Sequence, residues 1–222
     1  MAQQFTNVEF DPKQCRIEID EFGALLRAKA ELSEKTDVQP FFKGRVQVSA
    51  FIGSLMRNIG PASQICFEYG FFGDYTADLV FGDKAYRKFC VIEFEDGRLQ
   101  SIFKPSQTGN TRVWSPRFEH GFSQIIDWYT MLDDLKKSER FKRDFGDGHI
   151  RFSALLIIGR DAGVANSYDR FRLNWRADKV SVDSNNVICV TFDELHYHMD
   201  RQLRVNMGYW FRQLYLAPHS PD

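Results

Sequence analysis

Two apolar stretches that contain carboxylates constrain this chain more than any other feature. Residues 77–81 and 90–96 read Ala-Asp-Leu-Val-Phe and Cys-Val-Ile-Glu-Phe-Glu-Asp, with a basic turn between them. Their β-branched and aromatic content is typical of strands. A charged side chain in such a strand costs free energy unless something compensates it, and divalent cations bind carboxylate oxygens. The pattern therefore predicts two paired strands that carry a metal site.

The spacing of the carboxylates predicts how they lie. Residues two apart in a strand share a face, so Glu93 and Glu95 point the same way. If residues 76–82 and 88–95 form a hairpin, Asp78 lies nearly opposite Glu93, although a slip of one residue would change the face. Three such carboxylates would hold Mg²⁺ or Mn²⁺ and support phosphodiester hydrolysis. The alternative is an exposed sheet face with acidic residues.

The rest of the chain predicts helices around a sheet. Residues 1–60 read as a mostly helical cap, with a short strand or hairpin within 8–19 and helices over 21–35 and from Asp37 onward. Residues 61–222 read as the α/β core. Further strands are expected at 65–69, 152–158 and 187–192, and helices from Ser115-Pro116 to about Leu135 and over 194–215. The apolar run 152–158 is typical of an interior strand.

Composition limits the partners. The net charge is −1, so no global positive field attracts nucleic acid. Contact with DNA would need an oligomer or local patches such as Lys84, Arg87 and Lys88, which adjoin the acidic strands in sequence. The four cysteines have no metal-binding spacing, which favours buried thiols. With no signal peptide and no apolar run long enough for a membrane span, we expect a cytoplasmic protein without membrane contact.

Several ordered segments resemble one known family. Asp78 followed by Glu93-Phe94-Glu95 looks like the PD-(D/E)xK nuclease motif. The surrounding residues 91–96, 114–128, 157–160 and 191–195 are similar to the Shedu anti-phage defence nucleases, and the resemblance extends over about residues 20–200. It implies a restriction-endonuclease-like core with a central mixed sheet flanked by helices. It also implies a Mg²⁺-dependent (or Mn²⁺-dependent) DNA endonuclease, acting on phage or plasmid DNA as a homo-oligomer under an activator that the sequence does not identify.

By position, the resemblance makes Asp78 and Glu93 metal ligands. Glu95 stands where the family usually has a Lys that orients the attacking water. Some restriction enzymes of the superfamily also have Glu there, so Glu95 is a third candidate ligand. Lys104 and Arg112 are the nearest candidates for the missing positive charge.

The helix that begins at Ser115 carries further candidates. Gln124 and Trp128 match a Gln-x-x-x-Tyr element of relatives, in which Gln124 would help order the site, unless it is an ordinary surface glutamine. Glu119 and His120 lie near the helix start; His120 is a candidate base or DNA contact, or a structural histidine. Glu68 is a candidate extra ligand or a solvent-facing residue.

Two other functions stay open. The Glu at position 95 favours a catalytically silent nuclease-fold module that binds nucleic acid or a partner protein. A nuclease acting on RNA is the third hypothesis. The first hypothesis predicts that cleavage is lost when Asp78 or Glu93 is replaced, whereas a silent module predicts no metal-dependent cleavage at all.

Overall fold

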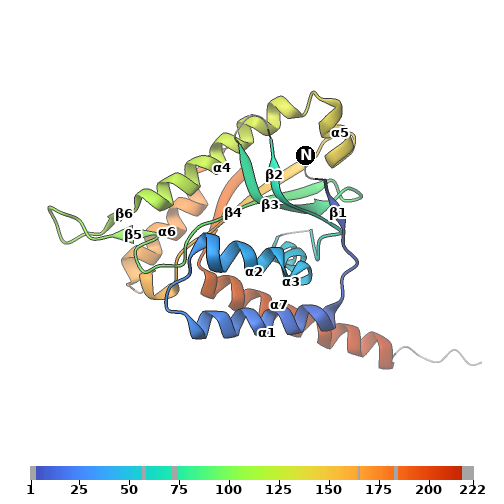
Figure 1. The fold of residues 1–222 in the computed structure, drawn as a ribbon, viewed down its shortest axis with the longest axis horizontal. Coiled ribbons are helices and arrows are strands. Elements are labelled where there is room, and N and C mark those ends of the chain that lie inside the picture. Colours follow the sequence, from blue (N-terminus) through green and yellow to red (C-terminus); the bar gives the residue numbers. More distant parts are fainter. Residues whose placement is uncertain (1–3, 57–58, 72–74, 165, 183–184, 217–222) are drawn as a thin grey trace, which may run out of the picture.

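The computed structural model describes residues 4–56, 59–71, 75–164, 166–182 and 185–216, and it confirms the predicted mixed α/β fold (Figure 1). A seven-stranded mixed sheet lies at the centre, with the order β1-β2-β3-β4-β7-β9-β8. Its strands are β1 (Thr6–Asn7), β2 (Gln64–Gly70), β3 (Thr76–Asp83), β4 (Lys88–Phe94), β7 (Arg151–Ile157), β8 (Ser181–Val182) and β9 (Asn185–Val190).

The sheet is antiparallel on one side of β4 and parallel on the other. β2, β3 and β4 form an antiparallel meander, whereas β4, β7 and β9 run parallel. Parallel neighbours need crossover connections. These contain α4 (Pro116–Leu135) and α5 (Glu139–Phe145) before β7, and η3 (Asp161–Val164) and α6 (Ser167–Lys179) before β9. Two short strands, β5 (Phe103–Lys104) and β6 (Val113–Trp114), form a separate ribbon.

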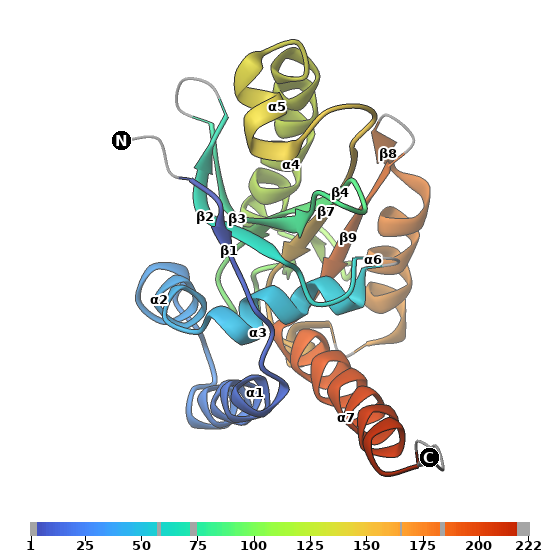
Figure 2. The same ribbon diagram turned by 90° about the vertical axis from the view of Figure 1, so that its right-hand side faces the viewer.

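α4 and α5 lie on one face of the sheet, and helices from both ends of the chain cover the other face (Figure 2). These are α1 (Pro12–Ala28), η1 (Glu34–Val38), α2 (Gln39–Lys43), α3 (Val46–Phe51), η2 (Ile52–Leu55) and α7 (Phe192–Leu216). Figure 2 shows the sheet between this layer and the layer of α4 and α5. No helix in the described part of the chain combines the length and the apolar character that a membrane crossing requires.

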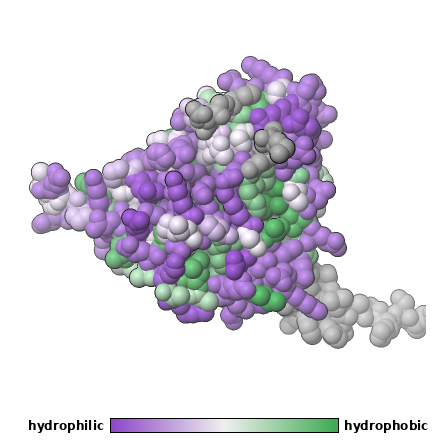
Figure 3. Space-filling view, viewed as in Figure 1, coloured by the Kyte–Doolittle hydropathy of each residue, from purple (hydrophilic) through white to green (hydrophobic). Residues whose placement is uncertain are grey.

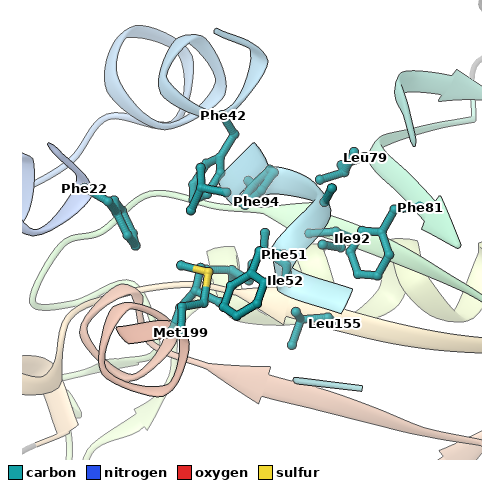
Figure 4. Close-up of a cluster of buried hydrophobic side chains, with 14 of the residues drawn as sticks. Phe22, Phe42, Phe51, Ile52, Leu79, Phe81, Ile92, Phe94, Leu155 and Met199 are labelled. Atoms are coloured by element: carbon teal, nitrogen blue, oxygen red, sulfur yellow. The ribbon is translucent and has the colours of Figure 1, made fainter. Parts of the chain in front are cut away.

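Each face of the sheet has its own hydrophobic core. Figure 4 shows part of the first, in which Phe22, Phe42 and Phe51 of the N-terminal helices meet Ile92 of β4 and Met199 of α7. The second lies under α4 and α5. The first 60 residues are thus mostly helical, as predicted, and their core is shared with the sheet.

The predicted strand or hairpin at 8–19 is wrong, because α1 begins at Pro12. The Asp11 side chain caps this helix by accepting hydrogen bonds from the backbone N–H groups of Lys13 (2.8 Å) and Gln14 (3.3 Å). The buried positions are Cys15, Ile19, Phe22 and Leu26, a helical spacing. Ile17, which suggested strand alternation, is 52% exposed.

Other helices differ from the prediction to different degrees. The helix expected from Asp37 onward is divided into η1, α2, α3 and η2, with Gly44 and Arg45 between α2 and α3. α4 is confirmed: the Ser115 hydroxyl accepts a hydrogen bond from the Phe118 N–H at 3.0 Å. α5 and α6 lie in segments for which no helix was predicted.

Candidate metal centre

The β3–β4 hairpin has the register that the sequence predicted. Leu79 pairs with Ile92, so the next pair along the register is Asp78 and Glu93. Both residues line a cavity of about 1010 Å³ at the end of the hairpin that is away from its turn. The acidic side chains that line it are Glu34, Glu68, Asp78, Glu93, Glu95 and Asp96. Figure 3 shows this face of the molecule, where hydrophilic residues gather between α4 and α2.

Asp78 is fixed by two hydrogen bonds at the point where β3 and β4 separate. Its Oδ2 accepts from the backbone N–H of Phe94 at 2.9 Å, and its Oδ1 accepts from Nε2 of Gln39 at 2.8 Å. Burial raises the pKa of Asp78 to about 7, an effect that the Phe94 N–H opposes and the charge of Glu34 reinforces. The carboxylate is therefore costly to ionise without a nearby cation.

Glu93 is more deeply buried, at 7% exposure. Burial raises its pKa well above the ordinary value, and the charges of Asp78, Glu95 and Glu34 raise it further. Two buried carboxylates that disfavour each other's charge are stabilised by a divalent cation, whose preferred ligands are carboxylate oxygens. The donor chemistry of Asp78 and Glu93 therefore fits Mg²⁺ or Mn²⁺.

Glu95 has different partners. Its side chain is 2% exposed, and its Oε2 lies 2.5 Å from Nη1 of Arg117, while Nδ1 of His120 lies 3.4 Å from its Oε1. Burial raises the pKa of Glu95, and Arg117 opposes this rise. α4 can approach this carboxylate because a Cβ on Gly121 would lie only 3.1 Å from Oε1. Within the described residues, no three His, Cys, Asp or Glu side chains form a group that could hold a metal ion.

Besides His120, three of the other predicted residues also line the cavity. Gln124 does so with an Oε1 atom that is buried and has no hydrogen-bond partner in the described part of the protein. Glu68 forms an ion pair with Lys43 at 2.5 Å and has a φ of 50°, an unfavourable backbone conformation for a non-glycine residue. Lys104 of β5 is exposed at the rim. Gln124 therefore offers an oxygen beside the carboxylates.

Arg112 and Glu119 do not line the cavity, because other partners hold them. The Arg112 guanidinium donates to the Gly163 and Phe103 carbonyl oxygens at 2.7 and 2.6 Å, and pairs with Asp169 at 3.0 Å. Glu119 accepts two hydrogen bonds from Arg176, each of 2.7 Å. Both contacts link α6 or η3 to the rest of the fold.

The predicted DNA contacts Lys84, Arg87 and Lys88 lie at the other end of the hairpin. Five residues separate Lys88 from Glu93, which in a strand corresponds to about 17 Å. Nζ of Lys84 donates to the Arg143 carbonyl oxygen at 2.9 Å. These three basic side chains therefore cannot reach a phosphate bound at the acidic pair. Their contact with DNA stays a prediction.

Sequence reasoning missed the residues that contact the acidic groups. Arg117 lies 3.0 Å from Oε2 of Glu34 and 3.1 Å from Oδ2 of Asp96, in addition to its contact with Glu95. A signal for Arg117 existed, because a cation in the first turn of a helix opposes the helix dipole and calls for an anionic partner. Gln39 and Glu34 carried no comparable local signal.

The sheet, its helical layers and the acidic cavity define a mixed α/β domain consistent with a nuclease-like core. A family model described as "Shedu protein SduA, C-terminal" matches residues 31–196, which is well over half of the chain. The chain therefore belongs to this family, and the family implies a role in anti-phage defence. Comparison with curated proteins gives no match.

Proposed function

We propose that this chain is a metal-dependent endodeoxyribonuclease of the PD-(D/E)xK type, which hydrolyses phosphodiester bonds of phage or plasmid DNA in the cytoplasm. The observation that carries the proposal is the buried pair Asp78 and Glu93 at the end of the β3–β4 hairpin, where burial raises the pKa of both carboxyls. Perturbed carboxyls in a polar cavity are a recognised indication of an active site. Membership of the Shedu family supports the defence role.

Asp78 and Glu93 are the residues that would hold Mg²⁺, with Mn²⁺ as an alternative. Mg²⁺ is commonly bound through one or two carboxylates and keeps water and phosphate oxygens at its other positions, so two ligands suffice. The bound ion would polarise the phosphate and lower the pKa of a water molecule. The Phe94 N–H and Gln39 orient Asp78, and Gln124 lines the same cavity with an Oε1 that has no hydrogen-bond partner in the described residues.

The DNA-binding surface requires more than this cavity. The net charge of −1 and the acidic lining both repel a polyanion. We propose that several copies of the chain together present the positive surface, as a homo-oligomer, and that an activator controls it. Lys84, Arg87 and Lys88 are candidates for contacts to phosphates away from the cut site.

Plasmid cleavage with matched variants tests the proposal. We expect the wild-type protein to nick supercoiled DNA with Mg²⁺ or Mn²⁺ and not with EDTA. Asp78→Asn and Glu93→Gln should abolish both cleavage and Mn²⁺ binding measured by calorimetry. Asp127→Asn, which changes an exposed carboxylate of α4, should leave both intact. Full cleavage by Asp78→Asn and Glu93→Gln would contradict the proposal, and so would a wild-type protein that does not bind Mn²⁺.

A second candidate is a catalytically silent module that binds nucleic acid or a partner protein. The observation that favours it is Glu95, whose carboxylate contacts Arg117 and His120 and forms no three-residue metal group with Asp78 and Glu93 within the described chain. Such a module would bind a labelled DNA or RNA duplex equally well in wild type and Glu93→Gln and would cut neither. Cleavage of RNA in place of DNA in the same assay would support the RNA nuclease.

A further inference from the structure

An acidic cavity needs a cation if it is to accept a phosphodiester. Six carboxylate side chains line the cavity, and the transition state of phosphodiester hydrolysis gains further negative charge on phosphate oxygens. One divalent ion at Asp78 and Glu93 offsets only part of this charge. The basic residues that line the same cavity are Arg98, Lys104 and Arg117.

Among these three cations, only Arg117 forms an ion pair within the described residues with Glu95, the carboxylate two residues after Glu93. Arg117 contacts the buried Glu95 at 2.5 Å through Nη1 and Asp96 at 3.1 Å through Nε, and its side chain is 44% exposed. Arg98 is more exposed, at 57%, and its carboxylate contact is with Asp96 at 3.3 Å. Lys104 is exposed and forms no ion pair with the described residues. Arg117 is thus the cation of the cavity whose position the surrounding carboxylates fix.

The guanidinium of Arg117 is oriented and still has one free amino group. Glu34 and Glu95 both contact Nη1 and Asp96 contacts Nε, whereas Nη2 has no hydrogen-bond partner in the described part of the molecule. A guanidinium that carboxylates fix through Nη1 and Nε can use Nη2 to donate to a phosphate oxygen. Both oxygens of Glu95 already face groups of α4, which favours a role in holding Arg117 over a role as a metal ligand.

We propose that Arg117 is the residue that binds the scissile phosphate of DNA, and that Glu95 is its anchor and not a metal ligand. This proposal rests on the proposed nuclease function. Position 95 would thus contribute positive charge indirectly, since its carboxylate holds a guanidinium from the neighbouring helix. Gly121 is part of the arrangement, because any larger residue there would enter the space of Glu95.

A measurement of metal binding, which needs no cleavage, distinguishes whether Glu95 is a metal ligand or the anchor of Arg117. We expect Glu93→Gln to weaken Mn²⁺ binding in a calorimetric titration by more than about 100-fold, and Glu95→Gln by less than about tenfold, which is below the roughly 10–100-fold that loss of a group supporting a metal ligand typically causes. Arg117→Lys should bind Mn²⁺ as the wild type does. A loss with Glu95→Gln as large as that with Glu93→Gln would show that Glu95 is a ligand and would overturn the proposal.

Cleavage kinetics test the phosphate contact. Arg117→Met would leave Glu95 buried without its partner, so the variant to use is the double change Glu95→Gln, Arg117→Met, together with Arg117→Lys. We expect the double variant to fold, bind Mn²⁺ and lose about 100-fold in kcat with a much smaller change in KM. Arg117→Lys should retain part of the rate, and added guanidinium ion should restore part of it to the double variant. Lys13→Met, which changes an exposed lysine of α1 outside the cavity, is the matched control, with kcat close to that of the wild type, and Arg98→Met and Lys104→Met test the two other cations of the cavity.

The outcomes distinguish the two proposals. A wild-type protein that neither binds Mn²⁺ nor cuts DNA overturns the nuclease function, and the role of Arg117 with it. A wild type that binds and cuts, together with a double variant of unchanged kcat, overturns the role of Arg117 alone. A large loss of kcat in Lys104→Met with none in the double variant would assign the phosphate to Lys104 and would equally overturn the proposal.

Discussion

The metal-free protein should lose stability as the pH rises, and Asp78→Asn should remove the part of this loss that comes from Asp78. Burial raises the pKa of Asp78 from 3.8 to about 7. Below about pH 4 the carboxyl is protonated in both the folded and the unfolded chain. Between about pH 4 and about pH 7 only the folded chain keeps the proton, so the free energy of unfolding falls with rising pH. Above this range the proton is lost from both states and the loss of stability is complete.

The magnitude follows from the pKa. A rise from 3.8 to about 7 corresponds to about 4 kcal/mol at about 1.4 kcal/mol per pH unit. About 3 kcal/mol of this falls between about pH 5 and about pH 8. In Asp78→Asn, the Asn oxygen can still accept from the Phe94 N–H, and the Gln39 amide can rotate so that its oxygen accepts from the new amide. The variant therefore keeps both hydrogen bonds at position 78 and loses the titration, while the rotated Gln39 gives up its 3.4 Å contact with Glu34.

Urea unfolding with EDTA over this pH range measures the effect. We expect the stability of the variant relative to the wild type to increase by about 3 kcal/mol between about pH 5 and about pH 8. Adding Mg²⁺ at about 100 times its Kd should stabilise the wild type by about 2.7 kcal/mol and leave the variant unchanged. Asp127→Asn is the control and should follow the wild type. Parallel curves for wild type and Asp78→Asn would refute the argument, because they would show that Asp78 titrates alike in both states.

Three further substitutions test contacts outside the acidic pair. Gly121→Ala places a methyl group 3.1 Å from Oε1 of Glu95 and should lower stability by about 1–3 kcal/mol, seen as a lower Tm. Glu18→Ala removes the buried acceptor of the Val48 N–H (2.7 Å) and should cost about 1–3 kcal/mol in urea unfolding, whereas Glu18→Gln keeps an acceptor and should cost clearly less. Arg160→Met separates the start of α7 from the last carbonyl oxygens of α1 and should cost about 3 kcal/mol; an unchanged Tm would show that this link is dispensable.

The central hairpin could be predicted from sequence because its information is local. The two apolar runs of β3 and β4 and the short turn between them leave few registers, and a slip of one residue would place the carboxylates on the wrong face. α4 was equally clear, since Ser115 and Pro116 mark its start and the apolar positions follow a helical period. These two elements alone bring Asp78, Glu93 and Gln124 to one cavity.

The features that could not be predicted from the sequence depend on contacts between segments that are distant along the chain. The spacing of Cys15, Ile17 and Ile19 fits a strand as well as a helix, and only packing against α7 and α3 decides which side is buried. Arg117 meets Glu95 across 22 residues and Gln39 meets Asp78 across 39. No local rule identifies such partners. Sequence reasoning therefore did not reveal that an arginine lies beside Glu95, the predicted third metal ligand.

The N-terminal layer then takes part in the site and does not merely cover the sheet. η1 and the start of α2 contribute Glu34 and Gln39, and these two side chains lie 3.4 Å apart between Nε2 and Oε1. Gln39 donates to Asp78, and Glu34 accepts from Arg117. A displacement of this one short segment would therefore change a partner of Asp78 and a partner of Arg117 at the same time. The acidic pair and its contacts consequently depend on three elements, the hairpin, α4 and the η1–α2 segment, while β2 and residues 96–104 also line the cavity.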